Sequence, residues 1–299
     1  MEQIFPILIL LLVGMGCKKI PAFPADTDKA LNLFVIYVAL PALILIRIPQ
    51  LTFSPAVLIP VGMSWAGCAL AALSIVIASR LFRWSRETTG ALLLVVPLGN
   101  TSFLGIPMVK AFFGNDAVSH AVLYDQFGSF LALSTYGSFI LSRFGTGGTN
   151  SIGGVLKKTL LFPPFLALNT ALLFHAYTYP QWLQALLDQA AAALVPVVMV
   201  AVGFQMRLLI PLNDLLPFII GLTIRMAVIP LIFLSLCTLF GLKGPAVHVS
   251  IFETAMPPMV TAGALASVAG LKPRLAAAMV GGGIFLSFLT LPLLYRLMQ

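Results

Sequence analysis

Apolar runs of bilayer-spanning length follow one another along nearly the whole chain, separated by short polar stretches. The runs cover residues 3–17, 29–48, 54–79, 89–113, 117–141, 157–177, 184–206, 215–240, 245–270 and 274–297. A helix needs about 20 predominantly apolar residues to cross the hydrocarbon core of a bilayer, and most of these runs reach that length. The pattern predicts an all-α polytopic membrane protein with ten transmembrane helices, or spans.

The fourth run differs from a plain membrane helix because polar residues and helix breakers lie in its middle. Within LVVPLGNTSFLGIPMVKAFFG, the polar residues Asn100, Thr101 and Ser102 lie between Pro97 and Pro107. Proline removes a backbone donor and clashes with the preceding turn. We therefore expect two half-helices in this span, so that a helix entering at Val95 does not run unbroken past Pro107.

The ninth run repeats this design. In IFETAMPPMVTAGALASVAG, Glu253 and Thr254 stand just before the pair Pro257 and Pro258. Backbone groups freed by such breaks are tolerated at membrane depth only where protein or a wet cavity surrounds them. Two broken helices at matching places of two halves indicate the binding site of a transporter.

Composition and charge support membrane embedding. Of 299 residues 60% are hydrophobic and 9% charged, with mean hydropathy +1.05, whereas a soluble domain has about 25% charged residues. The net charge of +8 is spread over short loops, which indicates topology and argues against a nucleic-acid partner. Twelve Lys and Arg follow the odd-numbered spans and four follow the even-numbered ones or end the chain. This places both termini outside the cell membrane, expected to be a bacterial inner membrane.

A Gly/Ser/Thr-rich loop, SRFGTGGTNSIGGVL, divides the chain into two groups of five spans. With an odd number of spans in each half, the second half enters the membrane from the opposite side. The ten helices are therefore expected to form an inverted five-plus-five repeat in which the broken spans 4 and 9 correspond. Residues 143–156 would be the cytoplasmic linker between the repeats.

GNTSFLGIP in span 4 and ETAMPPMVTAGALA in span 9 resemble the two signature segments of the auxin efflux carrier family, which includes plant auxin carriers and bacterial permeases for small carboxylates. The short central loop favours the bacterial type. The resemblance implies a fold similar to bile-acid sodium symporters, in which spans 4 and 9 cross inside a core transport domain, here residues 53–142 and 213–299. Residues 1–52 and 157–212 (spans 1, 2, 6 and 7) would form a scaffold, suited to a homodimer contact, against which the core moves like an elevator.

Crossed half-helices offer sites for both signs of charge. Their N-termini carry partial positive charge suited to a carboxylate, and their C-termini present carbonyls suited to a cation. We expect the substrate-binding residues to be Asn100, Thr101, Ser102, Gly105, Pro107, Met256, Pro257 and Pro258. No cofactor is expected apart from a coupling ion.

Glu253 is the strongest single candidate for a functional residue. A carboxylate inside an apolar membrane span costs free energy, so it is by default expected to have a function. Its alternative role is a structural ion pair with Arg225 of the neighbouring span. Similar folds place a sodium ion beside a span 9 acid, which suggests a cation cluster of Asn100, Thr101, Asp125, Ser129 and Glu253. Asp125 and Ser129 are four residues apart and so share one helical face. These residues leave Na⁺ and H⁺ both open as the coupling ion.

The sequence favours a secondary active transporter of small organic anions, such as carboxylates or auxin-like acids, over three other classes. An enzyme is not expected, because HExxH and Ser-elbow patterns are absent. A cation/proton antiporter on the same fold is the main alternative, but Asp125 is followed by Gln126 and not by a second acid. A channel is disfavoured because two broken helices suggest alternating access.

Overall fold

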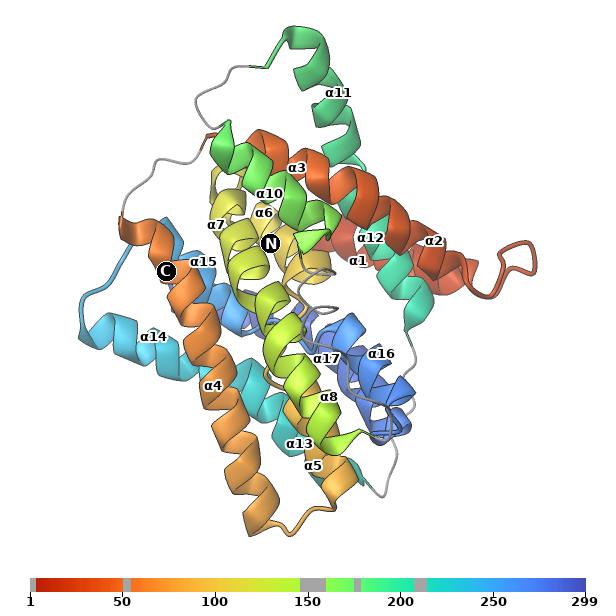
Figure 1. The fold of residues 1–299 in the computed structure, drawn as a ribbon, viewed down its shortest axis with the longest axis vertical. Helices are drawn as coiled ribbons and strands as arrows, with labels where there is room; N and C mark the ends of the chain where they lie inside the picture. Colours follow the sequence, from red (N-terminus) through yellow and green to blue (C-terminus); the bar gives the residue numbers. More distant parts are fainter. Residues whose placement is uncertain (1–3, 51–54, 146–159, 175–178, 207–213) are drawn as a thin grey trace.

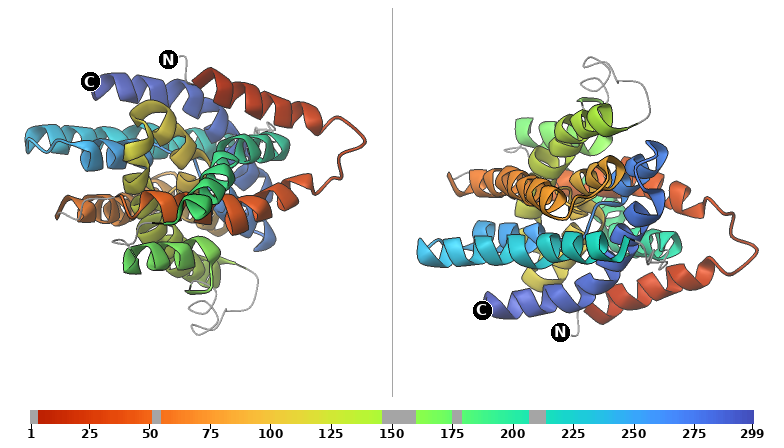
Figure 2. Two further views of the ribbon diagram at one scale, coloured as in Figure 1. Left: turned by 90° about the horizontal axis from the view of Figure 1, so that it is seen from above. Right: turned by 90° about the horizontal axis from the view of Figure 1, so that it is seen from below.

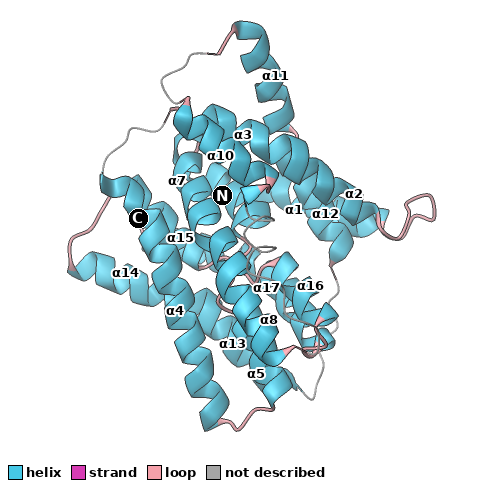
Figure 3. Ribbon diagram, in the orientation of Figure 1, coloured by secondary structure: helices cyan, strands magenta, loops and turns pink. Residues whose placement is uncertain are grey.

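The computed structural model describes residues 4–50, 55–145, 160–174, 179–206 and 214–299, and within these ranges its regular elements are helices (Figure 3). The first half contains α1 (Ile4–Cys17), α2 (Thr27–Phe34), α3 (Leu40–Arg47), α4 (Leu58–Leu81), α5 (Arg86–Val95), α6 (Ile106–Phe113), α7 (Val118–Leu123) and α8 (Ser138–Phe144). The second half contains α10 (Pro163–Leu173), α11 (Gln181–Ala192), α12 (Leu194–Gln205), α13 (Leu215–Thr223), α14 (Ile229–Leu239), α15 (Pro245–Thr254), α16 (Val260–Val268) and α17 (Pro273–Leu297). The predicted linker 143–156 lies outside the described residues from residue 146 onward.

Several α-helices are joined by wider π-helical turns into longer stretches. These turns are η1 (Val35–Ala39), η3 (Thr101–Gly105), η5 (Tyr124–Phe130), η6 (Leu133–Gly137) and η8 (Ile224–Val228), and two short 3-10 turns are η2 (Pro55–Val57) and η4 (Asn115–Ala117). Within the described residues, five continuous stretches are long and apolar enough to cross a membrane: Thr27–Arg47, Leu58–Leu81, Gln181–Gln205, Leu215–Leu239 and Pro273–Leu297. The protein is therefore a multi-pass membrane protein, and the count of ten spans and the inverted repeat stay predictions.

The outer surface of the helices is aliphatic. Leu173, Leu239 and Val268 are 81%, 77% and 87% exposed, as expected for side chains that face lipid. The molecule is elongated in Figure 1. In the two views along its long axis in Figure 2, the helices lie in several layers.

Three of the π-helical turns end two residues before a proline. They precede Pro41, Pro107 and Pro230. Proline lacks an N–H and its ring clashes with the carbonyl one turn back. A π turn shifts the preceding carbonyls, so the helix passes through the proline without breaking.

The break of the fourth span therefore lies elsewhere than at Pro107. Helix α5 ends at Val95, the chain is irregular from Val96 to Asn100, and helix resumes with η3 and α6. As expected, the helix that reaches Val95 does not run unbroken past Pro107 and the span is divided into two half-helices, but Pro107 itself lies within helix because η3 accommodates it. The break in the ninth span falls where the sequence indicates it, between Thr254 and Val260.

The two breaks pair with each other. Gly99 and Pro258 form an antiparallel β-bridge. The Asn100 N–H donates to the Pro257 carbonyl at 2.7 Å, and the Met259 N–H donates to the Leu98 carbonyl at 2.9 Å. Segments about 160 positions apart in the sequence thus satisfy each other's backbone groups in the interior.

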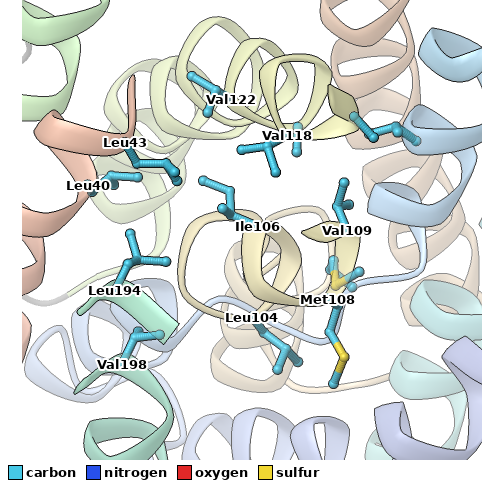
Figure 4. Packing of buried hydrophobic residues seen from close by; sticks show 14 of the residues in the cluster. Leu40, Leu43, Leu104, Ile106, Met108, Val109, Val118, Val122, Leu194 and Val198 are labelled. Carbon is cyan, nitrogen blue, oxygen red and sulfur yellow. The ribbon is translucent and has the colours of Figure 1, made fainter. Parts of the chain in front are cut away.

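Helix packing brings the predicted scaffold spans together. Helix α1 packs along α12, α3 packs on α10 and α11, and α2 packs on α12 (Figure 1). Close approach of α1 and α12 depends on two glycines, since a methyl group at Gly14 or Gly203 would clash with the facing backbone. The half-helix α6 packs its apolar side chains near α3, α7 and α12, as Ile106 shows in Figure 4 among Leu40, Val122 and Leu194.

Candidate functional site

Arg225 occupies the centre of the helix crossing. It projects from η8, and its side chain is 2% exposed. Its Nε donates to the Met256 carbonyl at 2.8 Å and its Nη1 donates to the Pro97 carbonyl at 3.2 Å. The guanidinium also lies against Gly99, where an added methyl group would clash with it. One cation from a third helix therefore contacts both breaks.

Asp125 is surrounded by donors. Its Oδ1 accepts hydrogen bonds from Thr101 Oγ1 and Ser102 Oγ, both at 2.5 Å, and its Oδ2 accepts one from Gln126 Nε2 at 2.6 Å. The hydroxyls come from η3 of the broken span and the carboxylate from η5. This cluster ties the second half of span 4 to the neighbouring helix.

Glu253 lies near the end of α15 and is fully buried. Neither of its carboxylate oxygens has a hydrogen-bond partner among the described residues. A methyl group at Gly105 would clash with both oxygens, so the carboxylate lies directly against the backbone of η3. The alternative role, an ion pair with Arg225, is not formed within the described chain, because the guanidinium is directed at two backbone carbonyls.

Asn100 caps the restart of span 4. It is 2% exposed, and its carbonyl accepts hydrogen bonds from the N–H groups of Leu104 and Gly105. Its side-chain Nδ2 has no partner within the described part of the protein. A buried donor without an acceptor marks a place where a ligand atom would relieve a penalty of about 1–3 kcal/mol.

A cavity of about 750 Å³ adjoins the starts of both second half-helices. Phe103 of η3 and Val260 and Thr261 of α16 line it, so it reaches the N-terminal ends that follow each break. On the other side it is lined by α2 and α12, including Asn32 and Gln205. Its outer part includes Lys18, Asp26, Asp28 and Lys29. A cavity of this size is within the range of small-molecule sites, about 300–1,000 Å³.

The charges at the crossing are divided between the helix ends. Arg225 bonds to carbonyls just past the C-terminal ends of α5 and α15, where helices carry partial negative charge. The cavity adjoins the N-terminal ends, where partial charge is positive and no side chain caps α16. An anion can therefore be stabilised on the cavity side.

Of the residues expected to hold Na⁺, Thr101 and Ser102 donate their hydroxyl protons to Asp125 and keep oxygen lone pairs, and the carboxylate oxygens of Glu253 have no partner in the described chain. Ser129 is buried and forms no hydrogen bond with the Asp125 carboxylate in the described structure. No group of three or more His, Cys, Asp or Glu able to hold a metal occurs within the described ranges. Hard cations need several oxygen ligands directed at one point.

The remaining expected site residues lie at or near the breaks. Met256 and Pro257 are buried, and both contribute carbonyls to the pairing described above. Pro258 forms the bridge to Gly99. Pro107 is buried inside the continuous helix beyond the break.

Sequence reasoning missed the contributions of Gly99, Gln126 and the aromatic Phe103. Gln126 stands beside Asp125 and carries an amide into a buried position, which was a usable signal. Nothing in a linear pattern indicates that Gly99 must make room for a side chain 126 positions away.

An all-helical membrane fold, in which two broken helices pair beside buried carboxylates and a cavity, defines a membrane transporter. A family model described as "Membrane transport protein" matches residues 1–295. The chain belongs to this family, the auxin efflux carrier family, as the two motif segments indicate.

Two relatives have a similar length. The chain is 30% identical over 266 residues to an uncharacterized transporter of Methanocaldococcus jannaschii, covering 86% of this chain and 85% of that one. It is 27% identical over 296 residues to an uncharacterized transporter of Methanothermobacter thermautotrophicus, covering 98% and 96%.

Proposed function

We propose that the protein is a secondary active transporter of small organic anions, carboxylates or auxin-like acids, which bind where the broken spans 4 and 9 cross. The observation that carries the proposal is the division of charge at the crossing. Arg225 neutralises the carbonyl ends, while the N-terminal ends adjoin the cavity. A carboxylate bound there would meet the amide donors at the start of α16, which lines the cavity, while Asn100, with its buried and unpartnered Nδ2, lies three residues before the lining residue Phe103.

The cavity suits an inward-facing state. Lys18, after α1, and Lys29, in the first turn of α2, line its outer part and lie on the side that the charge count assigns to the cytoplasm. Substrate would therefore exchange with the cytoplasm in this conformation.

An elevator-like movement would carry the crossing past the scaffold. The apolar contact of α6 with α3 and α12 has few directional bonds to break, which supports sliding (Figure 4). Spans 1, 2, 6 and 7 would stay fixed in the bilayer. In a homodimer, these spans would form the contact between the two copies of the chain.

The coupling ion, Na⁺ or H⁺, would act through the buried acids Asp125 and Glu253. A cation/proton antiporter is the second candidate function, because Glu253 is buried without a partner in the described chain. It would move cations with no organic acid present.

Uptake of radiolabelled malate, malonate and indole acetate into proteoliposomes tests the proposal, with pH and Na⁺ gradients imposed separately. We expect saturable uptake and counterflow. Asn100→Ala should raise the KM at least about tenfold, the equivalent of one lost hydrogen bond to a charged group. Asn169→Ala on α10, whose amide bonds within its own helix, is the matched control. Ohmic current, or unchanged affinity in Asn100→Ala, would contradict the proposal, and Na⁺-dependent proton flux without acid uptake would support the antiporter.

A further inference from the structure

The position of Arg225 is set by the π turn of span 8 in which it lies. It is the second residue of η8, the π turn that precedes Pro230 in span 8. Its side chain is among the largest fully enclosed ones in the described protein. A charged side chain at membrane depth is retained only where the protein gives it partners.

The partners of Arg225 are backbone carbonyls and not a carboxylate. Pro97 follows the C-terminal end of α5, and Met256 follows that of α15. Carbonyls left free at a helix end are cation ligands, and here a guanidinium takes that position.

Three further carbonyls of the breaks accept hydrogen bonds from backbone N–H groups of the paired segments. Leu98 accepts from Met259, Asn100 accepts from Gly105, and Pro257 accepts from Asn100. Together with the carbonyls bonded to Arg225, five backbone oxygens of the breaks each have a donor, whereas the two carboxylate oxygens of Glu253 have no partner in the described chain. The hydroxyls of the nearby cluster are directed at Asp125.

We propose that Arg225 is a built-in cation that occupies the carbonyl site between the two breaks, so that the crossing binds no metal ion and transport does not require Na⁺. This inference rests on the proposed function for its transport consequence. Arg225 is then a positioning residue: it holds the backbone of both breaks in one arrangement while the substrate binds at the opposite helix ends. A fixed cation also moves with the crossing, so no metal ion has to be released from the carbonyl site on either side.

The first experiment measures cation binding without any substrate. The melting temperature of the purified wild-type protein is recorded in NaCl and in choline chloride at equal ionic strength. A ligand that binds the folded state raises this temperature, and we expect no Na⁺-specific rise. A saturable Na⁺-specific rise would overturn the proposal.

Variants then test the role of the guanidinium. Arg225→Gln should lower transport at least about tenfold, since two charged hydrogen bonds are lost, and should acquire a Na⁺-specific thermal shift because the carbonyls are freed. Arg225→Lys keeps the charge and should stay insensitive to Na⁺. Arg274→Gln, at an exposed position of α17, controls for loss of a positive charge.

The outcomes separate the two proposals. If Arg225→Gln matches Arg274→Gln in transport, stability and cation response, the assignment of Arg225 fails. If Arg225→Gln does not fold, the wild-type and Arg225→Lys measurements decide. If no organic acid is transported, the proposed function fails, whereas the thermal measurements still test the built-in cation. Wild-type uptake that stays within about twofold when Na⁺ is replaced supports both.

Discussion

Gly99→Ala tests the geometry of the crossing with a single methyl group. Gly99 has an ordinary backbone conformation, so alanine adds no strain of its own. A Cβ at this position would lie 2.9 Å from Cζ of Arg225 and closer still to Nη2. The guanidinium cannot keep its place beside that methyl group, so either it leaves its carbonyl partners or the paired backbone separates.

The expected loss of folding free energy is set by whichever of these two responses costs less free energy. Losing one hydrogen bond to a charged group costs about 1.5–3 kcal/mol, and overpacking a close-packed interior costs about 1–3 kcal/mol. We expect Gly99→Ala to destabilise the protein by about 2 kcal/mol or more, a fall in melting temperature of about 4 °C or more. Transport should fall with it, because the breaks are no longer held together.

Thermal unfolding of the purified variant in detergent measures the effect. Gly62→Ala is the control, because Gly62 lies in α4 with no atom within 4 Å of an added Cβ. Alanine in a helix interior is favoured over glycine by about 0.5–1 kcal/mol, so this control should be neutral or stabilised. Equal melting temperatures for the two variants would show that Arg225 does not occupy the described position.

Three further changes have expected outcomes. Thr101→Val removes one donor to Asp125 and should cost about 1–3 kcal/mol, measured by thermal unfolding, because a buried acceptor loses a partner. Gly203→Ala should cost about 1–3 kcal/mol in the same assay, because the methyl group meets the backbone of Leu11. Asp214→Asn breaks a 3.1 Å salt bridge whose lysine is one-third exposed, and should change stability by less than about 1 kcal/mol.

Each of these changes has a matched comparison. Thr170→Val removes an exposed hydroxyl that bonds within α10, and it should leave the melting temperature near that of the wild type. Gly16→Ala adds a methyl group with nothing within 4 Å. For Asp214→Asn, high salt should abolish the small difference, since salt screens exposed charges. A large loss in any control would indicate that the described packing is wrong at that position.

Local features of the fold were predictable because they depend on local chemistry. Apolar run length located the long helices, and the Pro257–Pro258 pair located the second break. Polar residues beside prolines indicated the first break, although its position was assigned too broadly. Pro107 lies within helix because the preceding turn is π-helical, and nothing in the residue pattern distinguishes that turn from an α turn.

The contacts of the crossing were not predictable because they join distant parts of the chain. Asp125 and Thr101 were both chosen, but their hydrogen bond depends on how two helices face each other. An ion pair of Arg225 with Glu253 was the main alternative to a functional role for Glu253. The actual partners of Arg225 are carbonyls, which every residue carries, so the sequence contains no signal that selects them.

The π turns also fix the rotational register of the residues around them. Each α-helical residue advances the helix by about 100°, so one extra residue in a turn changes which side every later residue faces. A single-residue deletion within Ile224–Val228 would therefore leave span 8 helical and apolar while turning Arg225 and Pro230 away from their relative positions. In this protein, the length of a turn determines where a charge points as much as the identity of the residue that carries it.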